Sequence, residues 1–171
     1  MVLENRFNKL IEARHGTILY NKNDIYIGKS IEKYGEFSYL EAKIFEQICK
    51  DGDVVIEVGA NIGAHTLYLS KLVGNGFVFA FEPQRLVFQN LCANLALNSI
   101  SNVFAYQEAV SNENGTIIIP ECNFKENNNF GGINIENTKN GTTVNKQKLD
   151  NFLNKIDRLK LLKIDVEGME I

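Results

Sequence analysis

The chain has 171 residues, of which 44% are hydrophobic and 23% are charged, and its formal net charge is -3. This length favours one globular domain, and the small negative charge gives no reason to expect a nucleic acid or an acidic membrane as partner. No apolar run approaches the roughly 18 residues of a membrane span, and no apolar signal core follows Met1. We therefore expect a cytoplasmic protein. Three widely spaced cysteines and two histidines predict reduced, mostly buried thiols and no metal site.

The first part of the chain predicts a small N-terminal unit. Apolar residues at helical spacing predict a helix over residues 1–14. Two short apolar runs, 17–20 and 25–28, flank a polar turn and predict a small hairpin. We expect residues 1–37 to form this unit and residues 38–171 to form the main domain.

The main domain is predicted to begin with an amphipathic helix. Ser38 and Glu41 stand three residues apart, as in a capping box, and indicate where this helix starts. Leu40, Ile44 and Ile48 recur at helical spacing, which predicts that they form its buried face.

The main domain then alternates short apolar runs with helical patterns. Strands are predicted over residues 54–58, 77–81, 103–106, 116–119 and 159–166, and helices over 63–73, from Pro83 to Leu95, and over 149–156. The alternation predicts an α/β fold with a parallel sheet and right-handed crossovers. The Asn- and Gly-rich stretch 111–148 predicts a loop or irregular hairpin and is a candidate mobile cover of the site.

A glycine turn joins the first main strand to its helix. It reads Gly59-Ala60-Asn61-Ile62-Gly63, and its two glycines let the chain turn tightly and let a ligand approach the backbone. The helix that follows directs free N–H groups at that ligand. The middle glycine of the dinucleotide fingerprint is absent, which disfavours NAD or FAD. A nucleoside ligand without phosphates, such as S-adenosylmethionine, suits this turn better.

Three carboxylates accompany the predicted strands. Glu57, Glu82 and Glu108 each stand at the carboxyl end of a predicted parallel strand, where open α/β sheets bind ligands. Glu82 is placed to accept hydrogen bonds from both hydroxyls of a ribose. Glu57 is a candidate neighbour of a cationic amino-acid tail, and Thr66 at the helix start is a candidate neighbour of the tail's carboxylate. The alternative for each glutamate is a solvated loop charge.

Four motifs resemble, in order and spacing, the FkbM family of S-adenosylmethionine-dependent methyltransferases. They are Val-Ile-Glu-Val-Gly-Ala-Asn-Ile-Gly from Val55, Phe-Glu-Pro from Phe81, Leu-Asp-Asn-Phe from Leu149 and Lys-Ile-Asp-Val-Glu-Gly-Met-Glu from Lys163. The resemblance implies a Rossmann-like class I methyltransferase fold, a mostly parallel sheet with flanking helices. It also implies O-methylation of a hydroxyl on a sugar, glycan or other small-molecule natural product, with S-adenosyl-L-homocysteine as the cofactor product.

The resemblance also assigns roles to residues by their positions in these motifs. The cofactor site would be lined by Glu57, Gly59, Ala60, Asn61, Gly63, His65, Thr66, Glu82, Pro83, Glu108 and Ala109. Glu108 and Ala109 would lie by the adenine, and Asp165 and Glu167 would face the methyl group and the substrate. Either acid is a candidate base for the hydroxyl proton, and one of them alternatively only caps the next turn and binds cofactor. His65 is another candidate base, or a first-turn helix residue that packs near the cofactor.

Two other interpretations stay open. Family members continue past a strand such as 159–166 into a helix and further strands, so we expect the C-terminal strands of the fold to be missing here. A chain of this kind could be a catalytically inactive cofactor-binding domain that forms a homodimer through exposed apolar edges. A nicotinamide oxidoreductase is the third interpretation, and the missing middle glycine disfavours it.

Overall fold

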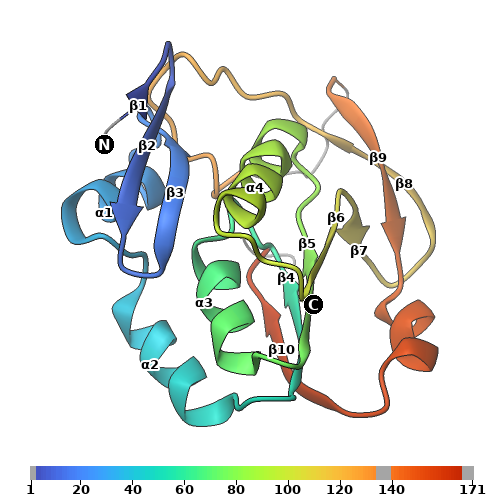
Figure 1. Ribbon diagram of the computed structural model, residues 1–171. Helices are drawn as coiled ribbons and strands as arrows, with labels where there is room; N and C mark the ends of the chain where they lie inside the picture. The colour runs from blue at the N-terminus through green and yellow to red at the C-terminus, as the bar shows by residue number, and fades with distance from the viewer. Residues whose placement is uncertain (1–2, 134–139, 167–171) are drawn as a thin grey trace.

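The computed structural model describes residues 3–133 and 140–166. Within these residues a central sheet of four parallel strands lies beside two smaller sheets (Figure 1). The central strands, in spatial order, are β10 (Leu159–Ile164), β4 (Val54–Val58), β5 (Phe77–Phe81) and β6 (Val103–Tyr106). The predicted α/β fold with a parallel sheet is therefore confirmed.

The strand order places a ligand crevice at β4. The chain runs outward from β4 to β5 and β6, and β10 then pairs with the opposite side of β4. Open α/β sheets bind ligands outside the carboxyl ends of the strands where the order reverses in this way. The glycine turn directly follows β4, so the topology places it in that crevice.

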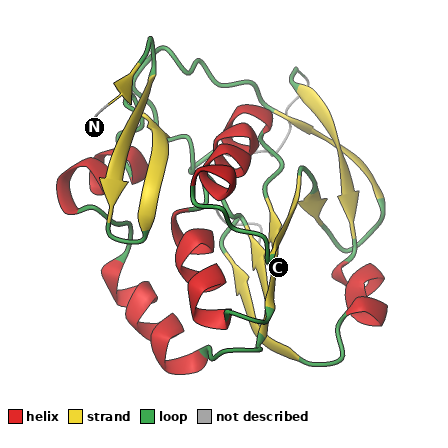
Figure 2. Ribbon diagram, viewed as in Figure 1, coloured by secondary structure: helices red, strands yellow, loops and turns green. Residues whose placement is uncertain are grey.

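Helices cover one face of this sheet (Figure 2). They are α2 (Tyr39–Ile48), α3 (Ala64–Val73) and α4 (Arg85–Leu97). Phe45 and Leu69 from α2 and α3 pack with Val55 and Val78 of the sheet. On the other face, the 3-10 helix Leu149–Lys155 buries Phe152 against Phe79, Phe81 and Tyr106. The centre of the sheet is thus buried on both faces, as its apolar strands predict.

The N-terminal unit differs from the prediction. Residues 1–14 do not form a helix: β1 (Leu3–Glu4) and β2 (Asn8–Ala13) form an antiparallel sheet with β3 (Gly16–Asn21). The predicted strand at 25–28 is also wrong, because α1 (Ile27–Tyr34) starts there. Pairing of β2 with β3 over six residues outweighs the weak helical spacing.

Two asparagines of α4 fix the N-terminal sheet to the main domain. Asn94 accepts a hydrogen bond from the Leu19 N–H at 2.6 Å and donates to the Leu19 carbonyl at 3.0 Å. Asn98 makes the same pair of bonds to Thr17, at 2.9 Å and 2.7 Å. Asn94 also donates to the carbonyl of Ile62 at 2.8 Å, so the same side chain holds the glycine turn. The boundary between residues 37 and 38 stays a prediction.

The helix α2 begins at the predicted place but turns a different face inward. Ser38 has φ 50° and its side chain makes no capping hydrogen bond. Leu40 and Ile44 are 73% and 51% exposed, whereas Ala42 and Phe45 are buried. The predicted buried face is therefore wrong at Leu40 and Ile44, because the position of α3 selects the face of α2 that packs, whereas Ile48 packs against the core as predicted.

The remaining elements follow the prediction more closely. α3 ends at Val73 with Gly74 as its C-cap, as predicted. α4 begins at Arg85, so Pro83 precedes this helix and does not lie in its first turn. The third sheet has the order β7 (Ala109–Val110), β9 (Thr142–Gln147) and β8 (Gly115–Ile119). The polar β9 was not predicted as a strand, and it pairs antiparallel with β8 over five consecutive positions.

Cysteines and membrane spans complete the description. Cys49 is buried and Cys122 partly buried, but Cys92 is exposed, which corrects the prediction for that thiol; all three are free. No helix within residues 3–133 and 140–166 has the length and apolar character to cross a membrane.

Candidate active site

The glycine turn has a backbone that suits glycine and asparagine. Gly59, Asn61 and Gly63 have φ values of 81°, 51° and 86°, a region that side chains other than that of asparagine rarely adopt. A Cβ atom on Gly59 would lie 2.0 Å from the carbonyl oxygen of Asp165. Glycine is therefore required here because the end of β10 closes directly on the turn.

Glu82 is held against this turn from the end of β5. Its Oε2 accepts the backbone N–H of Asn61 at 3.0 Å, and its Oε1 accepts the backbone N–H of Gln84 at 2.8 Å. The residue is 3% exposed, and burial raises its pKa to about 7, against the two backbone hydrogen bonds, which lower it. Each carboxylate oxygen keeps a further lone pair, so both can accept a hydroxyl hydrogen bond.

Glu57 lies beneath the turn, with both carboxylate oxygens already engaged by the protein. Thr66 donates its hydroxyl to Glu57 Oε2 at 2.6 Å, and Lys163 Nζ lies 3.6 Å from Glu57 Oε1. Glu57 is 1% exposed and Lys163 is also buried. The contact of Glu57 with a cationic cofactor tail stays a prediction, and in this structure its cationic neighbour is Lys163.

Lys163 also reaches the end of its own strand. Its Nζ lies 3.6 Å from Asp165 Oδ2, and the Asp165 side chain is 53% exposed. The Asp165 backbone N–H donates to the carbonyl of Val58 at 3.1 Å, which places the residue beside the glycine turn. Asp165 is thus an accessible carboxylate in the crevice. Glu167, the other predicted acid, lies outside the described residues.

Lys163 and Gln84 are site residues that sequence reasoning missed. Lys163 stood inside a recognised motif without a role. The feature that reveals its role is its position opposite Glu57 in the sheet. This position is known only once β10 is known to pair with β4. Gln84 follows the Phe-Glu-Pro motif, and its part in holding Glu82 is a backbone contact that no side-chain pattern reveals.

His65 packs away from solvent at the start of α3. Its ring contacts the rings of Phe37 and Phe45, and its Nε2 lies 3.2 Å from the Phe37 carbonyl oxygen. Burial lowers its pKa, although the nearby carboxylates of Glu57 and Glu41 favour the charged form. A ring enclosed in this way fits a packing residue better than a base.

The other predicted cofactor residues follow the carboxyl ends of the parallel strands. Glu108 follows β6, and its buried Oε2 has no hydrogen-bond partner among the described residues. Such an oxygen suits an amino donor, as an adenine ring offers. Ala109 begins β7, while Ala60 is buried in the turn and donates its N–H to the carbonyl of Phe81 at 2.9 Å. The orphaned oxygen, the available lone pairs of Glu82 and the bare backbone of the turn fit an adenosine ligand.

Comparison with known proteins identifies a family and related methyltransferases. The model of the methyltransferase FkbM domain matches residues 57–171. Methyltransferase 1 of Beauveria bassiana is 26% identical over 162 residues, covering 80% of this chain and 65% of that protein. Methyltransferase sdnD of Sordaria araneosa is 27% identical over 173 residues, covering 80% and 67%. The chain thus spans about two thirds of the length of these curated relatives.

Solved structures with a similar arrangement include a TYW2 protein from M. jannaschii in complex with AdoMet. It has a TM-score of 0.48 and 18% identity, covering 64% of this chain and 53% of that one. Trm5b from Pyrococcus abyssi has a TM-score of 0.47 and 17% identity, with coverage of 69% and 34%. The family match extends over more than half of the chain and includes the glycine turn, Glu82 and Asp165. The chain therefore belongs to the FkbM family of methyltransferases, whose methyl donor is S-adenosylmethionine.

Proposed function

We propose that this chain transfers the methyl group of S-adenosylmethionine to a hydroxyl oxygen of a sugar, glycan or natural-product acceptor. The observation that carries the proposal is the accessible carboxylate of Asp165 beside the glycine turn, at the point where the strand order reverses. Membership of the FkbM family supports methyl transfer. An accessible carboxylate can accept a proton from the acceptor, and a hydroxyl group has to lose its proton when its oxygen is methylated.

The chain's own residues would hold the cofactor along the carboxyl edge of the sheet. Glu82 would accept hydrogen bonds from the ribose hydroxyls, and Glu108 Oε2 would accept one from the adenine amino group. The N–H groups at the start of α3 would face the carboxylate of the amino-acid tail. S-adenosylmethionine supplies, when bound, a methyl group made electrophilic by its sulfonium.

Asp165 would then act on the acceptor. Methyl transfer to the acceptor oxygen would break the carbon–sulfur bond of the donor, leave the bonding electrons on sulfur and require the hydroxyl to lose its proton. Asp165 would take the hydroxyl proton in this step, while the ammonium of Lys163 orients its carboxylate from 3.6 Å. Holding oxygen, carbon and sulfur in line is worth roughly 7–11 kcal/mol in well-oriented systems. Glu167 is the second candidate for the proton.

Asp165→Asn is expected to lower kcat by about 10²–10⁴-fold, because it keeps the shape of the side chain and removes the proton acceptor. Affinity for S-adenosylhomocysteine should stay within about twofold, since the contacts of Glu82 are unchanged. Turnover is measured as release of S-adenosylhomocysteine on a panel of sugar and natural-product alcohols, and affinity by calorimetry. The exposed Asp157→Asn serves as the matched control. Undiminished turnover by Asp165→Asn would remove Asp165 from the mechanism.

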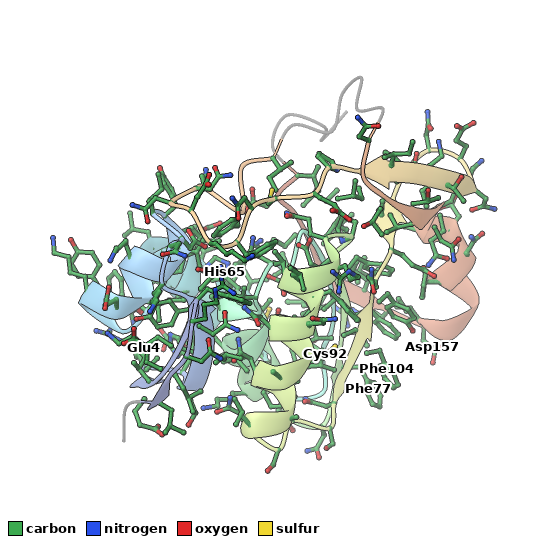
Figure 3. The ribbon with its side chains drawn as sticks, turned by 90° about the horizontal axis from the view of Figure 1, so that it is seen from above. Glu4, His65, Phe77, Cys92, Phe104 and Asp157 are labelled. Carbon is green, nitrogen blue, oxygen red and sulfur yellow. The ribbon has the colours of Figure 1, made fainter. Side chains whose placement is uncertain are left out.

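A second candidate function, binding through a homodimer, is favoured by an apolar area on the central sheet. The ring centroids of Phe77 on β5 and Phe104 on the edge strand β6 lie 5.7 Å apart, and both side chains are exposed (Figure 3). Leu162 and Ile164 are exposed on β10, the strand at the opposite edge. The strand register puts all of them on one face of the sheet. Light scattering should then give twice the monomer mass for the wild type and a monomer for Phe104→Ser. A monomeric wild type at all concentrations would argue against the dimer.

A further inference from the structure

A segment of the long β8–β9 connection crosses the site. We call residues 124–132 the strap, and Figure 1 shows this part of the chain running from the β8 side across the top of the molecule to the N-terminal sheet. The strap is fixed there by hydrogen bonds. Asn21 and Asn23 donate their side-chain amides to the Phe124 carbonyl at 2.9 Å and 3.0 Å. The backbone of Asn128 exchanges bonds of 3.0 Å with Asn23 and Ile25.

The other end of the strap is packed beside the glycine turn. Phe130 is buried in the cluster that contains Ile62 and Val87, and its ring stacks on Phe124 with centroids 4.5 Å apart. The side chain of Gln84 donates its Nε2 hydrogen to the Phe130 carbonyl at 2.9 Å. The strap is therefore held at both ends by specific contacts.

The strap meets the two residues that hold Glu82. Gln84 bonds Phe130 through its side chain and Glu82 through its backbone N–H. Asn61, which donates the other backbone N–H to Glu82, lies against Gly131: a Cβ atom there would be 3.3 Å from Asn61 Nδ2. Asn61 and Gln84, whose backbone N–H groups bond the Glu82 carboxylate, thus both touch the strap. Glu82 itself is almost fully buried.

We propose that the strap forms the closing wall of the ribose pocket, and that Gln84 is the positioning residue that couples its closure to Glu82. The inference rests on the proposed function, because it needs the ribose of the cofactor at Glu82. Ribose hydroxyls have to reach a carboxylate that the strap encloses, so the strap moves to admit them. Closure then restores the Gln84–Phe130 bond and retains the cofactor.

The test compares Gln84→Leu with the wild type in binding S-adenosylhomocysteine. The substitution removes the side-chain donor to Phe130 and keeps the backbone N–H to Glu82. We expect the dissociation rate, measured by stopped flow, to rise about 3–10-fold, the effect of one lost hydrogen bond. Glu126→Ala, an exposed change on the same strap, should leave the rate unchanged.

A second readout separates positioning from general stability. A loosened strap lets water reach Glu82, so the pH at which cofactor affinity falls should move to lower pH in Gln84→Leu but not in Glu126→Ala. Asn129→Ala is a second variant, since the Asn129 side chain accepts the N–H groups of Gly131 and Gly132 and shapes the strap from within.

The outcomes distinguish the two proposals. If the wild type binds S-adenosylhomocysteine and both variants keep its dissociation rate and its pH profile, the strap has no role in closure and the inference is wrong. If the folded wild type does not bind S-adenosylhomocysteine at all, the proposed function fails, and the role of the strap fails with it.

Discussion

Replacing Glu82 by glutamine is expected to weaken the binding of S-adenosylhomocysteine by roughly 10²–10³-fold. A carboxylate accepts hydrogen bonds from both ribose hydroxyls, and each charge-assisted bond is worth about 1.5–3 kcal/mol. Glutamine offers only one oxygen, and its NH₂ group faces a backbone N–H of Asn61 or Gln84. The dissociation constant is measured by calorimetric titration. The exposed Glu121→Gln serves as the control with the same chemical change.

The same carboxylate makes cofactor binding depend on pH. Burial raises the pKa of Glu82 from 4.5 to about 7, and hydroxyl donors favour the ionised form. Affinity should therefore fall by up to about tenfold for each pH unit below 7, and level off above it. Binding at pH 7 should release about half a proton per site, because half of the Glu82 carboxyls are protonated at their pKa, and titrations in buffers of different ionisation enthalpy detect this release. Equal affinities at pH 6 and pH 8 in the wild type would contradict this role.

The raised pKa has the opposite effect on stability. Because the folded-state pKa of Glu82 lies above the ordinary value of 4.5, its contribution to stability is fully present below that value and is lost as the pH rises through about 7. Glu82→Gln removes this titration. As the pH rises from 5 to 8, urea unfolding should thus show the ligand-free wild type losing stability relative to the variant. The affinity of the wild type for the cofactor should rise over the same range.

Replacing Lys163 by methionine is expected to lower the free energy of unfolding by about 3–5 kcal/mol, as removal of one partner from a buried ion pair does. Glu57 is 1% exposed, and Lys163 is the cation that the structure places within 4 Å of it. For a chain of this size the melting temperature should fall by roughly 6–20 °C. Thermal and urea unfolding measure the change. Lys160→Met, a partly buried lysine on the same strand, serves as the control.

A double variant separates the loss of the ion pair from the loss of packing. Glu57→Gln with Lys163→Met removes both charges and retains an acceptor for the Thr66 hydroxyl. More than half of the lost stability should return, because a buried pair contributes little once neither charge is left alone. The explanation by an unpaired Glu57 would fail if the double variant were as unstable as Lys163→Met.

The chain order of the main domain could be read from local signals, whereas the N-terminal unit could not. The strand at 77–81 and the helix over residues 63–73 were predicted almost to the residue, because an apolar run and a glycine each act over a few positions. The apolar spacing of residues 1–14 suits more than one structure, and pairing with β3 decided it. In the same way, the polar residues of β9 form a strand because they pair with β8.

The sequence by itself determined the α/β alternation, the glycine turn and the carboxylates at the strand ends, since these are set by which residues adjoin one another along the chain. Only the tertiary structure decided that Lys163 lies opposite Glu57, that Leu40 and Ile44 face solvent, and that the strap bonds to Gln84, which in turn holds Glu82. These contacts join residues far apart in the sequence. They depend on strand order and on the packing of neighbouring elements, which no local pattern encodes.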